Sequence, residues 1–448
     1  MIAADRLLAG PGDLSAVEAV RAVVSGERTV SEVAAAALAR AGEVEEEVMA
    51  FRSFDAAAVE GRAKELDAGG APAAGTAGVL RGVLVGVKDV IDTADAPTGY
   101  GSPLFSDHQP SADAACVATL RAAGALVFGK TESTEFAMYE PRRTRNPNDL
   151  GRTPGGSSSG SAAAVAAGVV SVALGTQTAG SVVRPGAYCG VYGMKPSRGW
   201  TSTDGIFLLA QSLDTLGLFS RRAADLGLLY RALRAPGFSQ GRRMRPARRS
   251  GVAGAGTAAV LRAGEWGEAD GDVHDALDEV ARRLERSGWA VSELRMPDAW
   301  RRLPEVHTGL MAVEVASNMR AALGERVELI SANARAIVER GDSTPGPAYL
   351  EARRETAEAR RLLPALEESF DVLLAPSALG VAPEGLAFTG DPVMCRPWTL
   401  LGLPSSNVPA VRRPDGLPVG VQAASPAYDD VSFLEDLVSI EAAVMERE

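Results

Sequence analysis

The sequence has few histidines, few cysteines and no long apolar run. Its 448 residues include three histidines and three cysteines. Cys116, Cys189 and Cys395 are not spaced like metal ligands and cannot all pair with one another, which indicates a reducing cytoplasm. The first residues lack both a basic start and an apolar core, so they predict no signal peptide. No run of about 18 apolar residues occurs, so we expect no membrane span.

Positive charge is also in short supply. Lysine and arginine number 46 against 57 aspartates and glutamates, a net charge of -11. Nucleic-acid binding needs a basic face, so nucleic acid is not the expected partner. The one basic cluster, residues 242–249, lies among Gly, Ser and Pro, and we interpret it as a solvated loop. A hydrophobic content of 46% is typical of a globular protein with a large core.

The order of apolar segments predicts an α/β fold. Residues 13–67 are typical of helices, with Ser31 as the N-cap of one of them. The apolar segment 79–92 predicts a buried strand, 113–124 a helix and 125–130 a second strand. A strand, a helix and a strand in this order indicate a wound α/β sheet.

Both ends of the chain contribute predicted strands, so we expect one large domain over residues 1–448. Its predicted parts are an N-terminal helical part (1–70), a core (75–230), a variable, mostly helical part (231–368) and a C-terminal return to the sheet (369–448).

Two familiar motifs occur in the wrong context. Residues 124–131 match the P-loop pattern, but its variable positions are the predicted strand and a helix precedes them, so we predict no nucleotide site. Residues 156–160 match G-x-S-x-G, but the preceding segment is polar and contains prolines, unlike a buried strand. None of His108, His274 and His307 is placed to serve such a serine as base.

Three other segments belong together. The serine-rich run "TPGGSSSGSAAAVAAG" (153–168) leads into an alanine-rich helix, a second serine stands in "TQTAGSVVRP" (176–185), and a lysine stands in "GVKD" (86–89). These segments resemble those of the amidase signature family. The resemblance covers residues 80–220 and 370–426, and it implies a large mixed central β-sheet flanked by helices on both sides, with no metal and no cofactor.

The resemblance implies a catalytic triad in which Ser181 is the nucleophile, Ser157 is a bridging serine in a cis peptide and Lys88 is the base. Backbone N–H groups are placed to form an oxyanion hole at Thr178, Ala179, Gly180 and Ser181.

Elementary chemistry agrees with this assignment. A serine nucleophile needs a base, and no histidine is suited to the role. The pKa of a lysine is ordinarily about 10.4, and burial lowers it. Lys88 follows the apolar run "VLVGV", so we expect it to be buried. A neutral lysine can draw a proton through an intervening hydroxyl.

The sequence departs from the family pattern at three positions. Gln177 stands where many members carry Asp, and Ala179 where many carry Gly. Arg184 lies three places after the nucleophile, as in malonamidase-like hydrolases and unlike the A subunits of glutamyl-tRNA amidotransferases. Arg184 would either hold a substrate carboxylate or pair with a buried acid or with backbone carbonyls.

We therefore predict a cytoplasmic amidase that hydrolyses a small-molecule carboxamide, with a carboxylate on the substrate if Arg184 binds one. Three alternatives stay open: an acyltransferase on the same fold, an amidotransferase A-like subunit of a complex, and a binding protein that has lost catalysis. The expected partner is the small-molecule amide, with no nucleic acid and no membrane, and a homodimer is left open.

Overall fold

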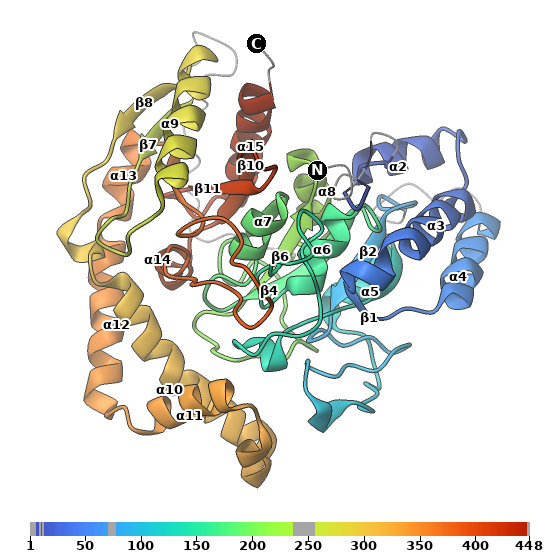
Figure 1. Ribbon diagram of the computed structural model, residues 1–448, viewed down its shortest axis with the longest axis horizontal. Helices are drawn as coiled ribbons and strands as arrows, with labels where there is room; N and C mark the ends of the chain where they lie inside the picture. Colours follow the sequence, from blue (N-terminus) through green and yellow to red (C-terminus); the bar gives the residue numbers. More distant parts are fainter. Residues whose placement is uncertain (1–5, 9, 11–12, 70–77, 236–255, 446–448) are drawn as a thin grey trace.

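One mixed sheet of eleven strands runs through the computed structural model (Figure 1). The structure describes residues 6–8, 10, 13–69, 78–235 and 256–445, so the basic cluster at 242–249 lies outside the described residues. In sheet order the strands are β1 (Phe51–Ser53), β3 (Leu126–Thr131), β2 (Leu84–Lys88), β4 (Val172–Gln177), β6 (Thr215–Ser220), β5 (Tyr192–Lys195), β10 (Ser405–Arg412), β11 (Pro418–Ala424), β9 (Val372–Pro376), β7 (Thr257–Val260) and β8 (Ala290–Glu293).

Helices flank this sheet along its whole length (Figure 1). At the N-terminal side they are α2 (Ala16–Val24), α3 (Val30–Val48), α4 (Ala56–Ala68), α5 (Ala115–Ala122), α6 (Ser159–Ala166), α7 (Val183–Cys189) and α8 (Ala223–Leu233). Farther along the chain they are α9 (Gly271–Arg286), α10 (Leu303–Leu323), α11 (Ala332–Asp342), α12 (Gly346–Arg360), α13 (Leu363–Ser369), α14 (Arg396–Leu401) and α15 (Asp430–Met445). Four short 3-10 helices are η1 (Pro103–Phe105), η2 (Glu135–Ala137), η3 (Asp298–Trp300) and η4 (Gly324–Leu329).

The strand directions are mixed, as expected. β2 lies between β3 and β4 and is parallel to both, and α5 connects β2 to β3 along the chain. From β4 to β9 in the sheet order, each strand is antiparallel to the next one, and β7 is parallel to both β9 and β8. The predicted α/β class with a large mixed central sheet is therefore confirmed, and so is the predicted strand at 125–130, which places β3 on the variable positions of the P-loop pattern.

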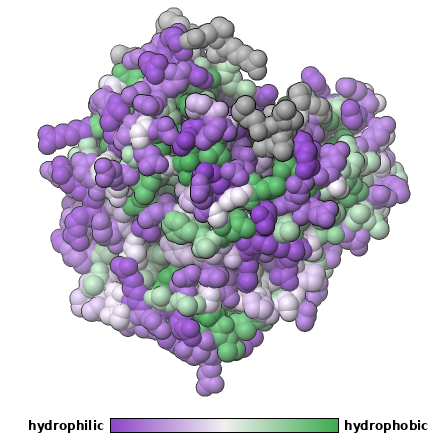
Figure 2. All heavy atoms as spheres, viewed as in Figure 1, coloured by the Kyte–Doolittle hydropathy of each residue, from purple (hydrophilic) through white to green (hydrophobic). Residues whose placement is uncertain are grey.

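Both faces of the sheet carry a hydrophobic core. In β2, Val85 and Val87 belong to one core and Leu84 to the other, because successive side chains of a strand point to opposite faces. Residues of α5, α8 and α10 contribute to the first core, and residues of α3, α4 and α6 to the second. Hydrophilic residues cover most of the face in Figure 2, with hydrophobic ones between them in smaller groups.

Two local predictions differ from the structure. Helix α3 begins after Thr29, whose side chain and that of Glu32 form a capping box, and not after Ser31. The hydroxyl of Ser31 instead donates to Asp67 at 2.6 Å. Strand β1 also interrupts the predicted helical part at Phe51–Ser53, because these residues pair with β3. No helix within the described ranges is both long and apolar enough to cross a membrane.

Candidate active site

Lys88 is the last residue of β2 and is fully buried. Its Nζ donates to Ser157 Oγ and to Thr176 Oγ1, each at 2.8 Å. Burial lowers the pKa of Lys88 from 10.5 to about 7, and the negative charge of Asp214 acts in the opposite direction. The ammonium thus meets hydroxyl groups and no carboxylate at its end, which is an arrangement that suits a lysine able to lose its proton.

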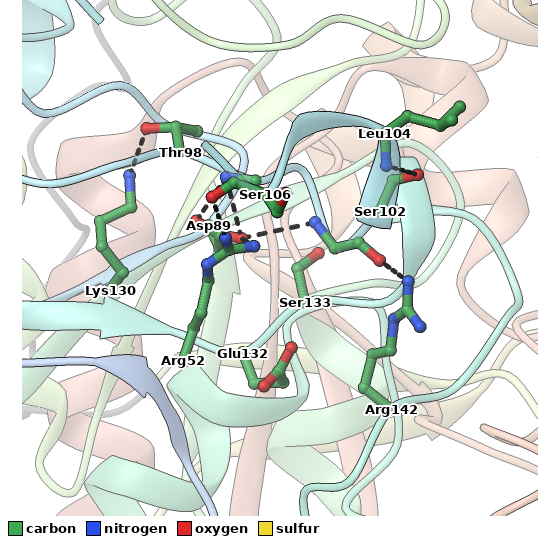
Figure 3. Close-up of polar contacts among 12 residues, drawn as sticks. Arg52, Asp89, Thr98, Ser102, Leu104, Ser106, Lys130, Glu132, Ser133 and Arg142 are labelled. Carbon is green, nitrogen blue, oxygen red and sulfur yellow. Dashed lines mark hydrogen bonds and ion pairs between the residues drawn. The ribbon is translucent and has the colours of Figure 1, made fainter. Parts of the chain in front are cut away.

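Asp89 fixes the chain where it leaves β2. Its carboxylate accepts from the N–H of Gly99 at 3.0 Å and from Arg52 Nη1 at 3.1 Å. Figure 3 shows Asp89 beside the Arg52 guanidinium, with Lys130 donating to Thr98 on the other side. Since Arg52 lies in β1, the strand that the sequence failed to predict holds the residue next to Lys88 in place.

The serine-rich run presents one hydroxyl to Lys88. The Gly156–Ser157 peptide bond is cis, as the resemblance implies, and Gly155 before it has a φ of 83°, which favours glycine. The other three serine hydroxyls donate to backbone carbonyls: Ser158 to Thr176 (3.4 Å), Ser159 to Gly155 (2.7 Å) and Ser161 to Leu174 (2.8 Å). Ser157 is therefore the member of the run whose hydroxyl can exchange a proton with the lysine.

Gln177 organises the loop between β4 and α7. Its Oε1 accepts from the N–H groups of Val182 (2.8 Å) and Val183 (3.1 Å) at the start of α7. Its Nε2 donates to Thr399 Oγ1 (2.9 Å), which donates in turn to the Ala179 carbonyl (2.8 Å). An aspartate could accept the first two hydrogen bonds but could not donate the third. The change from Asp to Gln thus adds a donor to this loop as well as removing a charge.

Thr178 is held from two sides by residues that the sequence analysis did not assign to the site. Its hydroxyl donates to Asp214 Oδ1, and its carbonyl lies 2.8 Å from Nε2 of His307. His307 is fully buried and Asp214 is partly buried. Burial raises the pKa of Asp214 to about 6 and lowers that of His307 to about 3. Asp214 directly precedes Thr215, which pairs with Gln177, so the register of the sheet brings Asp214 beside Thr178.

Ser181 lies in the wall of a small pocket, together with the rest of its loop. Its side chain reaches solvent only slightly, at 8% exposure. The Ser158 N–H donates to the Ser181 carbonyl at 3.3 Å, so the two serine-bearing loops are in contact. Within the described residues, the backbone N–H groups of four loop residues make no hydrogen bond: Thr178, Ala179, Gly180 and Ser181.

Arg184 lies in the first turn of α7, is 2% exposed and lines the same pocket. Its Nη1 donates to the carbonyl of Gly390 (2.5 Å), and its Nη2 donates to the carbonyl of Gly156 (2.6 Å) and to Thr389 Oγ1 (3.3 Å). It forms no ion pair with an acidic residue of the described ranges, and its Nε has no hydrogen-bond partner there. Backbone pairing thus accounts for part of the guanidinium and leaves donors for a ligand, so the carboxylate role stays a prediction.

A metal site is not apparent in the part of the chain that the structure describes. No group of three His, Cys, Asp or Glu side chains there could hold a metal ion. Cys116, Cys189 and Cys395 are all buried and free.

Comparison with known proteins identifies the family of the chain. The family model described as Amidase matches residues 32–434, and the chain belongs to that family. It is therefore an enzyme that acts on amide C–N bonds. The A subunit of the glutamyl-tRNA(Gln) amidotransferase of Roseiflexus castenholzii is 34% identical over 463 aligned residues, which cover 94% of each chain.

Solved structures agree with the fold. A crystal structure of an amidase matches with a TM-score of 0.83 and 28% identity, over 96% of this chain and 99% of that one. The peptide amidase of Stenotrophomonas maltophilia matches with a TM-score of 0.81 and 25% identity, over 98% of both. The family prediction is thus confirmed. The relatives named as the A subunits of amidotransferases do not support the finer likeness to malonamidase-like hydrolases. The position of Arg184 was therefore not enough to set this chain apart from the A subunits.

Proposed function

We propose that the chain is a serine amidase that hydrolyses a small-molecule carboxamide through an acyl-enzyme. The observation that carries the proposal is the 2.8 Å hydrogen bond between Lys88 Nζ and Ser157 Oγ, away from solvent and next to the loop of Ser181. Because the pKa of Lys88 is lowered to about 7, a substantial fraction of this lysine is neutral near neutral pH and can accept a proton.

In the proposed reaction Ser181 Oγ attacks the amide carbonyl carbon. Its proton passes to Ser157 Oγ while the Ser157 proton passes to Lys88 Nζ, so the bridging serine ends unchanged. The unpaired N–H groups of the 178–181 loop would hold the negative oxygen that forms. The C–N bond breaks as the leaving nitrogen takes the proton back through the same hydroxyl. Water then attacks the ester, and the acid leaves.

We further propose that the amide carries a carboxylate or another anionic group close to its carbonyl. Support comes from Arg184, a buried cation in the pocket wall with no acidic partner among the described residues. Arg184→Ala should lower kcat/KM for a carboxylated amide. The loss of transition-state stabilisation should be about 2–5 kcal/mol, the typical cost of leaving a charge unpaired in a desolvated site.

A neutral amide of equal size is the control for that variant, because it needs the backbone contacts of Arg184 but not its charge. Initial rates for both amides measure the difference. If Arg184→Ala lowers both rates equally, the arginine acts as a scaffold for the Gly156 and Gly390 carbonyls and binds no anion.

A second candidate is an amidotransferase A-like subunit, which the names of the relatives favour. Such a protein would pass ammonia to a partner through a channel. If its amide donor is a free amino-acid amide, that donor carries an ammonium as well as a carboxylate. The residues that line the pocket include Arg184 but no aspartate or glutamate, so hydrolysis of an amide without an ammonium fits the pocket better. An acyltransferase differs only in the group that attacks the acyl-enzyme.

The purified chain should release ammonia and the free acid from members of a panel of small carboxamides, with no partner protein added. Added hydroxylamine should divert part of the acyl group to a hydroxamate. If the chain forms the hydroxamate when hydroxylamine is added but releases no free acid when it is left out, the result would point to the acyltransferase. Ammonia release that begins only with a partner protein would point to the amidotransferase. The cytoplasmic location and the homodimer stay predictions.

A further inference from the structure

One wall of the Ser181 pocket comes from the part of the chain for which the sequence predicts no role. Met311 and Val315 of α10 and Ile337 of α11 line the pocket. His307 lies one turn before Met311, so positions 307, 311 and 315 form one stripe along α10. Figure 1 shows α10 and α11 side by side at the end of the molecule below the central sheet.

Three hydrogen bonds hold this wall against the rest of the site. His307 Nε2 meets the Thr178 carbonyl at 2.8 Å. Farther along the helix, Asn318 Nδ2 donates to the Leu209 carbonyl, and Glu314 Oε2 accepts from the Ser212 N–H, each at 2.9 Å. Thr178 precedes the nucleophile by three residues, and Leu209 also lines the pocket. These hydrogen bonds therefore fix the distance of α10 from the nucleophile loop and from the Leu209 side of the pocket.

The chemistry of this wall is apolar. Apart from the nucleophile loop and a small alanine, Tyr139 and Arg184, the pocket is lined by six apolar side chains: Met138, Leu209, Met311, Val315, Ile337 and Pro392. Two carboxylates beside this wall, those of Asp214 and Glu314, do not line the pocket and accept hydrogen bonds from other groups. Asp214 accepts from Thr178, Leu209 and Ala210, and Glu314 accepts from Ser212 and Tyr349.

We infer that the α10 wall binds an uncharged apolar substituent of the amide and excludes amides that carry an ammonium there, with Met311 and Val315 setting the length of the chain accepted. This inference rests on the proposed amidase function and names the class of substrate for it. An ammonium on this wall would lose its water and meet no carboxylate, because no aspartate or glutamate lines the pocket. An alkyl group would instead bury apolar surface against Met311 and Val315.

The test compares pentanamide with 5-aminopentanamide, which differ in one terminal ammonium, and adds straight-chain amides of other lengths. For the wild-type enzyme, kcat/KM should be at least about tenfold higher for pentanamide. Met311→Ala should move the preferred length upward by roughly two carbon atoms, because the space left by the side chain stays largely open. Val315→Ile, which narrows the pocket, should move it downward.

Met319→Ala is the matched control, since Met319 is also buried in α10 but does not line the pocket. It should leave the length preference unchanged. Equal or better cleavage of the ammonium amide overturns the inference, and so does a Met311→Ala variant with the same preference as Met319→Ala.

Fluorophosphonates with the same pair of alkyl and aminoalkyl chains provide a readout that needs no turnover. Faster labelling of Ser181 by the alkyl probe supports the inference, and equal labelling overturns it. If neither these amides nor a carboxylated amide is cleaved and neither probe labels the enzyme, the proposed amidase function fails and the inference fails with it. Cleavage or labelling without the expected preference leaves the proposed function standing and removes the inference alone.

Discussion

Ser181→Ala should lower kcat by about 10⁴- to 10⁶-fold, the range found when a serine enzyme loses its nucleophile. The expected cause is loss of the attacking oxygen, because Ser181 lines the pocket, whereas Ser157, the serine that meets Lys88, does not. Steady-state ammonia release, measured at saturating amide, gives the comparison. The variant should still bind substrate, since the apolar walls and Arg184 are unchanged.

Ser161→Ala is the control for this change. Ser161 is a buried serine of the same cluster whose hydroxyl donates to the Leu174 carbonyl. Its removal should affect stability more than rate. A Ser181→Ala enzyme that keeps more than a few per cent of the wild-type kcat would show that another group attacks the amide.

Lys88→Met should lower kcat/KM by about 10²- to 10⁴-fold, as expected when a general base is removed. In the wild-type enzyme the rate should rise with pH through about 7, the pKa to which burial lowers Lys88. The sign follows from the chemistry: the base acts in its neutral form, which increases as the proton leaves. Asp214, the acidic group that acts on Lys88, shifts this rise toward higher pH. The variant should lose the rise as well as the rate.

Lys195→Met controls for the removal of a buried lysine. Burial also lowers the pKa of Lys195 to about 7, but its Nζ donates to the carbonyls of Pro196 and Leu403, away from the serines. This variant should keep the rise in rate near pH 7 even if it is less stable. A normal rate in Lys88→Met across the pH range would mean that another group is the base.

The sequence carried enough information for the residues that act through local motifs. The strand ending at Lys88 is a short apolar run, and the loops of Ser157 and Ser181 are recognisable by composition and order. The α/β sheet was predictable from the order of its apolar segments, and its mixed strand directions were implied only by the resemblance to the family. The short edge strand β1 was not, because three residues in a helical context carry little pattern of their own and depend on pairing with β3.

Residues that act through long-range contacts escaped prediction. His307 lies 129 positions from Thr178 and Asp214 lies 36 positions from it. Nothing near either residue in the sequence points to the loop that it holds. The apolar wall of α10 was hidden in the same way, because a helix that lines a pocket shows the same spacing of apolar residues as one that lines the core. Only the folded chain brings Met311 to Ser181.

The proposed function depends above all on the acylation of Ser181. Rapid acid quenching during turnover of a good carboxamide, followed by peptide mass mapping, would locate the acyl group. We expect an adduct of the acyl mass on the peptide that contains Ser181, absent in Ser181→Ala and accumulating when added hydroxylamine is left out. An adduct on Ser157, Ser158 or Ser159 would contradict it.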